Sequence, residues 1–266
     1  MQPSGVITFT TDFGHKGPFA GVMKGVILSR FPGARIVDLG HEIPAHWPPE
    51  AGFWLSRAYP YFPSGTVHLA IVDPGVGTER RIIVVETDGH VFLAPDNGLL
   101  EPLLTANDDA KVYALDLDRL GGLKLDTPSL TFHGRDVFAP IAAEIAAGRL
   151  LPENTGAPTS DWAPGWIDPP ELADPARISG VIVTIDSFGN LISNIDEAML
   201  GSISRPEAHI AGHILPLKPT YGRATPGDYL ALINSFGVLE IARAEGSAAE
   251  GLGAERGAPV VVTESS

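Results

Sequence analysis

The pattern of apolar and polar positions divides the chain into two parts. In the first part, short runs rich in β-branched residues alternate with segments whose apolar residues recur at helical spacing. Strands are predicted at residues 5–11, 35–39, 66–72, 82–85, 90–94 and 111–116, the last at a sheet edge. Helices are predicted from Pro18 to a stop at Pro32-Gly33, from Pro48 to about Tyr59, and from Val137 to Gly148. This alternation predicts an α/β domain with a largely parallel sheet.

The second part has a different character. Six prolines and two tryptophans lie between residues 151 and 176, which predicts an ordered linker. Beyond it, short strand candidates are separated by glycine and proline turns, at residues 178–185, 191–195, 208–215, 229–233, 238–242 and 258–263. With hardly a helix among them, they predict a smaller all-β, barrel-like domain. We therefore expect an α/β domain over residues 1–155, a linker over 156–176 and the β domain over 177–266.

Composition excludes several classes of function. The 266 residues include no cysteine, which rules out disulfides, thiolate metal sites and a cysteine nucleophile, and agrees with a reducing compartment. A net charge of −14 argues against a nucleic-acid partner, because the chain repels phosphate backbones. We find neither an apolar run long enough to span a membrane nor a signal peptide, so we expect no membrane association and a cytoplasmic protein.

Charged groups gather where the predicted strands end. The stretch Asp73-Pro-Gly-Val-Gly-Thr-Glu-Arg80-Arg81 forms a tight loop after the apolar run 66–72. An α/β fold presents such groups to a crevice beside its sheet. The alternative is that Asp73 only caps its own turn, with surface arginines nearby, and this stretch does not decide between the two.

Nucleotide-triphosphate, dinucleotide and metal sites are each poorly supported. No Gly-Lys-Ser/Thr follows the glycines of the 73–81 loop, and no GxGxxG opens a helix. Side chains suited to a divalent metal are present in Asp12, Asp73, Asp96, His133 and Asp136. Their spacing matches no dense metal motif, so we expect no metal site.

Two turns in the second part resemble each other. Asp186-Ser-Phe-Gly-Asn190 and Asn234-Ser-Phe-Gly237 each place an aromatic ring, a glycine and an amide or hydroxyl at a strand end. Either one alone is ambiguous, because asparagine and glycine are ordinary turn formers. Together they would suit stacking and hydrogen bonding to a purine.

Taken in order, six stretches of the chain resemble the S-adenosyl-L-methionine (SAM) hydroxide adenosyltransferases, relatives of the fluorinase and chlorinase enzymes. These stretches are residues 11–14, 73–80, 95–98, 131–136, 186–190 and 234–237. The resemblance covers essentially the whole chain. It implies an α/β domain joined to a β-barrel domain, a homotrimer whose sites lie between subunits, and no cofactor beyond the substrate. The reaction implied is hydrolysis of SAM to adenosine and L-methionine, by attack of water or hydroxide on the ribose 5′ carbon.

The resemblance also implies roles for individual residues. Asp73, Arg80 and His133 would hold and activate the water, and Asp12 would bind the ribose hydroxyls. The remaining contacts are Phe188, Asn190 and Tyr221 around the adenine with backbone groups near Arg243 and Glu245, and Asp186 and Ser235 at the methionine amine and carboxylate. A carboxylate accepts two vicinal hydroxyls, and an asparagine pairs with both donor and acceptor edges of a base.

Several positions depart from the family's halogenases. Those enzymes carry a tyrosine in place of Asp73, a tyrosine in place of His133 and a hydroxyl in place of Gly134, so a water pocket replaces the halide pocket. A SAM-dependent halogenase is therefore the minor alternative. Gly17 stands where the family often has an acid, and Phe236 stands where the fluorinase has an arginine, so methionine recognition would rest on Ser235 and backbone groups. The alternative from another class is a non-catalytic protein that binds SAM or adenosine.

Overall fold

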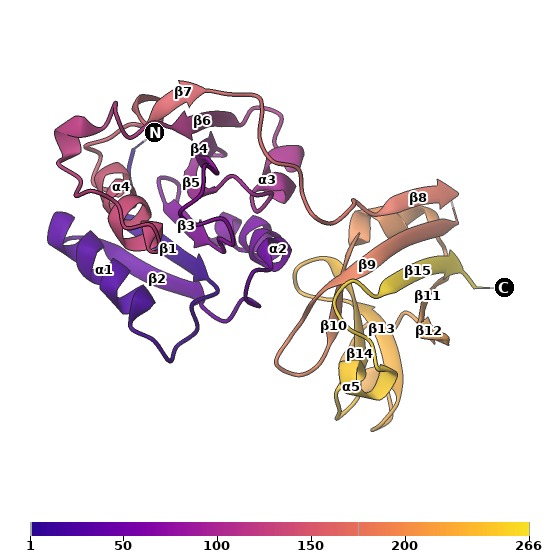
Figure 1. Ribbon diagram of the computed structural model, residues 1–266. Helices are drawn as coiled ribbons and strands as arrows, with labels where there is room; N and C mark the ends of the chain where they lie inside the picture. Colours follow the sequence, from indigo (N-terminus) through magenta and orange to yellow (C-terminus); the bar gives the residue numbers. More distant parts are fainter. Residues whose placement is uncertain (1, 175, 266) are drawn as a thin grey trace. The chain divides into compact units, whose positions relative to one another are not determined.

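The computed structural model describes residues 2–174 and 176–265 and forms two compact units, Met1–Trp166 and Ile167–Ser266 (Figure 1). The boundary between the units falls inside the segment 156–176. Each end of that segment adds a strand to its own unit, β7 (Gly156–Pro158) to the first and β8 (Glu171–Asp174) to the second. Among the helices of these ranges, none is long and apolar enough to cross a membrane.

The first unit is built on a seven-stranded sheet with the order β2-β1-β3-β5-β4-β6-β7. Its longer strands are β1 (Val6–Thr11), β2 (Arg35–Gly40), β3 (Val67–Ile71), β4 (Ile82–Thr87), β5 (His90–Pro95) and β6 (Lys111–Leu115). Strands β2, β1, β3 and β5 run parallel, whereas β4, β6 and β7 join them in antiparallel pairs. The sheet is therefore mixed, and the α/β class predicted from the sequence is confirmed.

The predicted position of residues 111–116 at the sheet edge is wrong. β6 pairs with β4 on one side and with β7 on the other, where Ala114 lies opposite Ala157. Gly156 allows this close pairing, because a Cβ atom there would lie 1.6 Å from the carbonyl oxygen of Ala114. A strand of three residues is too short to show an alternating pattern, so the sequence gives no sign of it.

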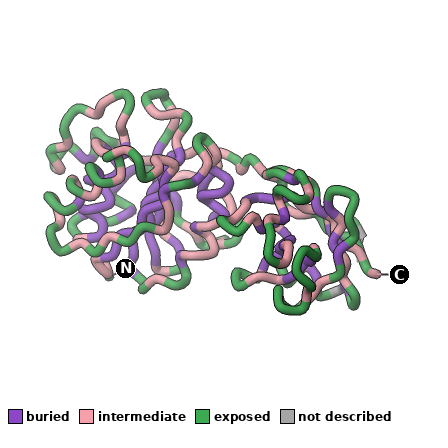
Figure 2. Tube along the Cα trace, turned by 90° about the horizontal axis from the view of Figure 1, so that it is seen from below, coloured by how far each residue is buried: buried purple, intermediate pink, exposed green. Residues whose placement is uncertain are grey.

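Helices cover both faces of the sheet (Figure 1). They are α1 (Phe19–Arg30), α2 (Pro48–Ala58), α3 (Glu101–Ala106) and α4 (Ala139–Ala146), with 3₁₀ turns η1 (Tyr59–Tyr61), η2 (Gly121–Leu123) and η4 (Pro152–Asn154) and a π-helical turn η3 (Gly134–Phe138). The predicted helices are confirmed, and α3 was not predicted. Side chains of α1 and α4 pack in one apolar cluster and those of α2 and α3 in another. Alternate residues of β5 enter the two clusters, as the twofold period of a strand requires. The buried strands are purple in Figure 2.

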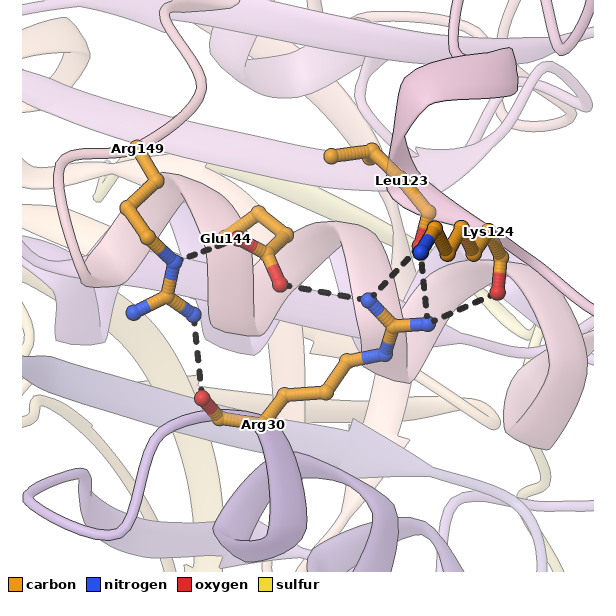
Figure 3. A network of polar contacts seen from close by, with 5 residues as sticks. All are labelled: Arg30, Leu123, Lys124, Glu144 and Arg149. Carbon is orange, nitrogen blue, oxygen red and sulfur yellow. Dashed lines mark hydrogen bonds and ion pairs between the residues drawn. The ribbon is translucent and has the colours of Figure 1, made fainter.

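A buried carboxylate ties α4 to the end of α1 (Figure 3). Glu144 accepts hydrogen bonds from Arg30 Nη1 at 3.2 Å and from Arg149 Nε at 2.6 Å. The Arg30 guanidinium also donates to the carbonyl oxygens of Leu123 and Lys124. The hydrogen bond from Arg149 and that from Arg30 lower the pKa of Glu144 despite its burial. The network also ties the turn η2 and the residue after it to the end of α1.

A second polar chain lies inside the sheet. Thr8 Oγ1 of β1 lies 2.8 Å from His68 Nδ1 of β3, and His68 Nε2 lies 3.1 Å from His90 Nδ1 of β5. His68 is fully buried and stacks on Phe92, with ring centroids 4.8 Å apart. Burial, assisted by the neighbouring His90, lowers the pKa of His68 to about 3. Burial lowers the pKa of His90 as well, so both imidazoles are neutral near pH 7 and are joined by one hydrogen bond between β3 and β5.

We expect this histidine pair to make the first unit sensitive to mild acid. As pH falls below 6.5, His68 is protonated in the unfolded chain and stays neutral in the folded chain down to about pH 3, so stability present above pH 6.5 is lost in between. Between pH 6.5 and 5, the wild type should lose about 2 kcal/mol of unfolding free energy relative to His68→Gln. Denaturant unfolding at both pH values measures this difference. His213→Gln replaces an exposed histidine and should show the same loss of unfolding free energy between pH 6.5 and 5 as the wild type. An equal loss in the wild type, His68→Gln and His213→Gln would contradict the expectation.

The second unit is an eight-stranded antiparallel sheet with the order β12-β11-β15-β9-β10-β14-β13, and β8 pairs with β9. Its elements are β9 (Arg177–Ile185), β10 (Leu191–Asp196), η5 (Glu197–Ser202), β11 (Pro206–Ile210), β12 (His213–Pro216), η6 (Tyr221–Arg223), β13 (Tyr229–Ile233), β14 (Val238–Arg243), α5 (Ala248–Leu252) and β15 (Pro259–Glu264). A bridge between Leu217 and Ala231 joins the two ends of the sheet. The nearly closed sheet confirms the predicted barrel-like domain.

One predicted strand of this unit is wrong. Residues 208–215 form a hairpin of β11 and β12 instead of a single strand. Ala211 and Gly212 both have positive φ, +49° and +79°, which is the backbone of a tight hairpin turn. Alanine seldom adopts this conformation, so the turn carries a weak sequence signal.

Candidate active site

The candidate site in the first unit begins where two parallel strands end. β1 and β3 are neighbours, with Thr11 opposite Ile71. Asp12 directly follows β1, and Asp73 follows β3 after Val72, so both acids leave the sheet at the same edge. The order of the strands explains why the loop after β3 is free to turn outward: β5 separates β3 from β4, and the loop must cross over it.

Asp73, Arg80 and His133 are brought together by direct contacts. Arg80 Nε lies 3.0 Å from both carboxylate oxygens of Asp73, and Arg80 Nη2 donates to Oδ2 as well. The same Nη2 lies 3.0 Å from His133 Nδ1. The side chains of Asp73 and Arg80 are 6% and 11% exposed, which makes this a largely buried ion pair with good geometry. The guanidinium thus bridges the acid and the imidazole.

The contact with Arg80 fixes the tautomer of His133. A guanidinium has no acceptor, so Nδ1 of His133 must accept and its hydrogen must sit on Nε2. Burial and the charge of Arg80 both lower the pKa of His133. The imidazole is therefore neutral near pH 7 and presents a donor away from Arg80. It stands at the start of the π-helical turn η3, a rare structure that is frequent at functional sites.

Two glycines let the 73–80 loop fold against its neighbours. At Gly75 a Cβ atom would lie 3.0 Å from Cγ of Arg80, so a side chain there would crowd the arginine. Gly77 has φ +78°, and a Cβ there would lie 2.1 Å from the carbonyl oxygen of Leu130. Both approaches depend on the absence of a side chain. The loop is thereby held between Asp73 and the segment before His133.

Asp12 lies beside this group without an observed contact to it. Its Oδ2 accepts from the backbone N–H of His46 at 3.1 Å, and the turn that carries it is tied to the following loop by Gly14 N–H to His41 O. The next residue, Phe13, packs against Phe132, with ring centroids 6.1 Å apart. Asp12 therefore sits on a turn that contacts the turn of His133.

The other acids considered as metal ligands are engaged elsewhere. Asp96 binds Arg81 and accepts from the backbone N–H of Ala163, while Asp136 binds Arg135 and accepts from the backbone N–H of Ser129. Within residues 2–174 and 176–265, no group of three or more histidine, aspartate or glutamate side chains is placed to hold a metal ion.

In the second unit, the predicted ligands Asp186, Phe188 and Asn190 share one turn. Asp186 Oδ1 accepts from the backbone N–H groups of Phe188 and Asn190, and Oδ2 accepts from Asn190 Nδ2 at 3.0 Å. Phe188 is 77% exposed at the tip. The turn packs closely on Ser247 and Ala249, because a Cβ at Gly189 would lie 2.2 Å from Ser247 Oγ and the Ala249 N–H donates to the carbonyl of Gly189. The structure therefore presents an exposed ring above a buried asparagine.

Tyr221 is held by Glu240, a residue that the sequence interpretation missed. Its hydroxyl donates to Oε1 of Glu240 at 2.5 Å, and Asn234 Nδ2 donates to Oε2 at 3.1 Å. Burial raises the pKa of Glu240, and the charge of Asp186 adds to this rise. The signal in the sequence was a single acid inside the apolar strand Val-Leu-Glu-Ile-Ala.

The last three predicted ligands lie at or just after the ends of β13 and β14. Ser235 is exposed between Asn234 and Phe236. Arg243 lies over the Tyr229 ring at 5.2 Å and donates from Nε to the carbonyl of Gly227. Glu245 has φ +57°, in the turn after β14. No hydrogen bond or ring contact among the described side chains joins these three to Tyr221.

Comparisons with known proteins agree with this two-unit architecture. Residues 7–156 match the SAM hydroxide adenosyltransferase N-terminal domain, and residues 180–261 match the C-terminal domain. The α/β unit and the β-barrel-like unit described above coincide with these two matched domains. The chain belongs to the SAM hydroxide adenosyltransferase family.

Individual relatives cover nearly the full length. An (R)-S-adenosyl-L-methionine hydrolase from Thermus thermophilus is 36% identical over 98% of this chain and 99% of that protein. A fluorinase from Actinoplanes sp. is 29% identical over 97% of each chain. The crystal structure of an uncharacterized conserved protein from Thermotoga maritima is 31% identical, with a TM-score of 0.87 over 97% of this chain and all of that one.

Proposed function

We propose that this protein hydrolyses S-adenosyl-L-methionine to adenosine and L-methionine. The observation that carries the proposal is the contact of Arg80 with both Asp73 and His133. Buried charged groups that converge at a sheet edge are suited to hold a small polar reactant, here a water molecule. Membership of the SAM hydroxide adenosyltransferase family and the hydrolase name of the Thermus thermophilus relative support the same reaction.

In the proposed reaction the water oxygen attacks the ribose 5′ carbon. The new C–O bond forms as the C–S bond breaks, and the electron pair of that bond leaves on the methionine sulfur. Since the sulfonium is already a good leaving group, no general acid is required, and the protein has to align the water and accept one proton. His133 Nδ1 is occupied by Arg80, whereas among the described residues Oδ1 of Asp73 accepts only from Arg80 Nε and retains a free lone pair. We therefore assign the proton to Asp73 and the alignment of the oxygen to Arg80 and His133.

The other residues would hold the rest of the substrate. Asp12 suits the two ribose hydroxyls, because one carboxylate can accept from both. The rings of Phe188 and Tyr221 are exposed and suit a purine face. The other assignments are Asn190 and the backbone near Arg243 and Glu245 at the adenine edge, and Asp186 and Ser235 at the methionine amine and carboxylate.

A turnover assay tests the proposal. The purified protein is incubated with the separated (R) and (S) sulfonium forms of SAM, because the relative's name specifies the (R) form, and the products are resolved by chromatography. Many equivalents of adenosine and methionine support the proposal. Binding of one equivalent without turnover would support the non-catalytic alternative, and a halogenated nucleoside formed in fluoride or chloride would support the halogenase alternative.

We propose that no metal or other cofactor takes part, because the water is held by side chains. Treatment with a strong chelator, followed by gel filtration into metal-free buffer, should leave turnover within twofold of the untreated protein. The assay is repeated after addition of Mg²⁺, Mn²⁺ or Zn²⁺. Loss of turnover that one of these ions restores would contradict this part of the proposal.

We further propose that the protein is a cytoplasmic homotrimer with one site per subunit interface. The resemblance to the family supports this assembly, in which the first domain of one subunit meets the second domain of the next. A head-to-tail interface repeated around a closed ring builds identical sites. The lack of cysteine agrees with a reducing compartment.

Subunit mixing tests the shared site. An Asp73→Asn chain and an Asn190→Ala chain should each be inactive alone, and together they should regain part of the activity after dissociation and reassembly. Some mixed interfaces then combine an intact first domain with an intact second domain. Light scattering should give the mass of three chains. Proven exchange of subunits without recovered activity would show that each chain closes its own site.

A further inference from the structure

Glu240 occupies a position where a carboxylate is costly. It lies in the middle of β14, is 3% exposed, and its neighbours in the strand, Leu239 and Ile241, are fully buried. The charge of Asp186 acts on it in addition to the burial. Burying a carboxylate destabilises a fold unless its hydrogen bonds are complete. An apolar side chain of similar volume at this position would stabilise the fold more.

Its two oxygens are used by two different turns. Oε1 accepts from the hydroxyl of Tyr221, in η6, and Oε2 accepts from Nδ2 of Asn234, after β13. Asn234 in turn accepts on Oδ1 from the backbone N–H groups of Phe236 and, at 3.4 Å, Val238. The carboxylate therefore anchors both the Tyr221 ring and the turn that contains Ser235.

The Tyr221 ring depends on this anchor. Tyr221 is 46% exposed, so about half of the side chain has no packing to hold it. It belongs to a single 3₁₀ turn between two exposed stretches. A ring that stacks on a ligand gains most when it is already held in the bound orientation. The hydrogen bond from the Tyr221 hydroxyl to the buried Glu240 carboxylate restrains the ring in this way.

We propose that Glu240 is a positioning residue for substrate binding, which orients Tyr221 against the nucleoside and fixes the 234–238 turn for the methionine end. This inference rests on the proposed function, since it names the ligand that these turns receive. Glu240 acts through Tyr221 and Asn234 and touches no reacting atom. It should therefore affect affinity and leave the chemical step, carried by the first unit, unchanged.

Two substitutions at this position separate positioning from folding. Glu240→Leu fills the volume, removes both acceptors and leaves the half-exposed Tyr221 free to bond to water. We expect at least a tenfold increase in KM for SAM and in Kd for adenosine, with kcat within threefold of wild type. Glu240→Gln can accept from Asn234 with its oxygen and donate to the Tyr221 hydroxyl with its amide, so both constants should return to within threefold.

A matched control removes a buried hydrogen bond at the neighbouring residue of β14. Ser193→Ala deletes the buried contact from Ser193 Oγ to the carbonyl of Leu239, the residue beside Glu240. It should lower the melting temperature without changing KM or Kd. Tyr221→Phe should reproduce part of the Glu240→Leu effect. The Kd of the double variant for adenosine should lie within twofold of the Glu240→Leu value, because both substitutions remove the same Tyr221–Glu240 hydrogen bond.

Measuring adenosine binding by calorimetry tests the positioning role of Glu240 separately from the proposed function. Wild-type binding of adenosine that Glu240→Leu leaves unchanged would overturn the positioning role while the proposed function stands. A fall in kcat with unchanged KM would overturn it too. Wild-type protein that neither binds adenosine nor turns over SAM would overturn the proposed function itself, and this inference with it.

Discussion

Asp73→Asn should lower kcat by about a thousandfold and change KM by less than threefold. General-base assistance and alignment are together worth roughly this much, or about 4 kcal/mol of transition-state stabilisation. Asparagine keeps one acceptor oxygen but replaces the other with an NH2 group that faces a donor of Arg80, so it weakens the contact with the guanidinium and cannot accept the proton. Steady-state kinetics with (R)-SAM measures both constants.

The control for this variant is Glu144→Gln, at another largely buried carboxylate bound by arginines (Figure 3). Both changes remove a charge from an ion pair in the same unit, and both should reduce the melting temperature. Only Asp73→Asn should reduce kcat. A kcat for Asp73→Asn within threefold of wild type would remove Asp73 from the chemistry, and an equal fall in both variants would assign the loss to folding.

Gly77→Ala should lower kcat by at least a hundredfold, although Gly77 contacts no proposed ligand. The new Cβ would lie 2.1 Å from the carbonyl oxygen of Leu130, and a backbone atom cannot move aside alone. The loop that carries Arg80 must therefore separate from the segment before His133. Displacement of catalytic groups by about 1 Å can cost two orders of magnitude in rate.

Gly212→Ala is the matched control, because Gly212 has φ +79°, against +78° for Gly77, and open space around its Cβ position. Both variants carry the cost of an L-residue at positive φ, about 1 kcal/mol of unfolding free energy. Comparable stability with activity lost only in Gly77→Ala would assign the effect to the close approach at Leu130. Full activity in Gly77→Ala would show that the loop tolerates displacement.

The sequence predicted the elements that are long enough to show a period. α1, α2 and α4 display apolar residues at helical spacing, and both domains have strands with clear apolar runs. The short elements α3, β7 and β8 offer two periods at most and were not predicted. The insertion of β5 between β3 and β4 is a property of the whole sheet, and local residue patterns do not encode the order of strands.

The residues of the candidate site differ in how far the sequence alone could predict their contacts. Asp73 and Arg80 are seven residues apart in one loop, so their contact follows from local sequence. His133 lies 53 residues beyond Arg80, and only the resemblance to a family joined it to them. Glu240 was missed because the interpretation looked for polar residues at strand ends, where turns expose them, and this acid is in mid-strand.

The pairing of β7 with β6 has a consequence for synthesis on the ribosome. The sheet of the first unit is complete only when residues 156–158 have been made, and the contacts of Asp161 and Ala163 with Arg81 and Asp96 follow still later. Until then, the outer edge of β6 has unpaired backbone groups that another nascent chain can join. A pause in translation that keeps residues 156–158 inside the ribosome would therefore leave the β6 edge exposed, whereas the unit can complete its sheet once residues up to Trp166 have emerged.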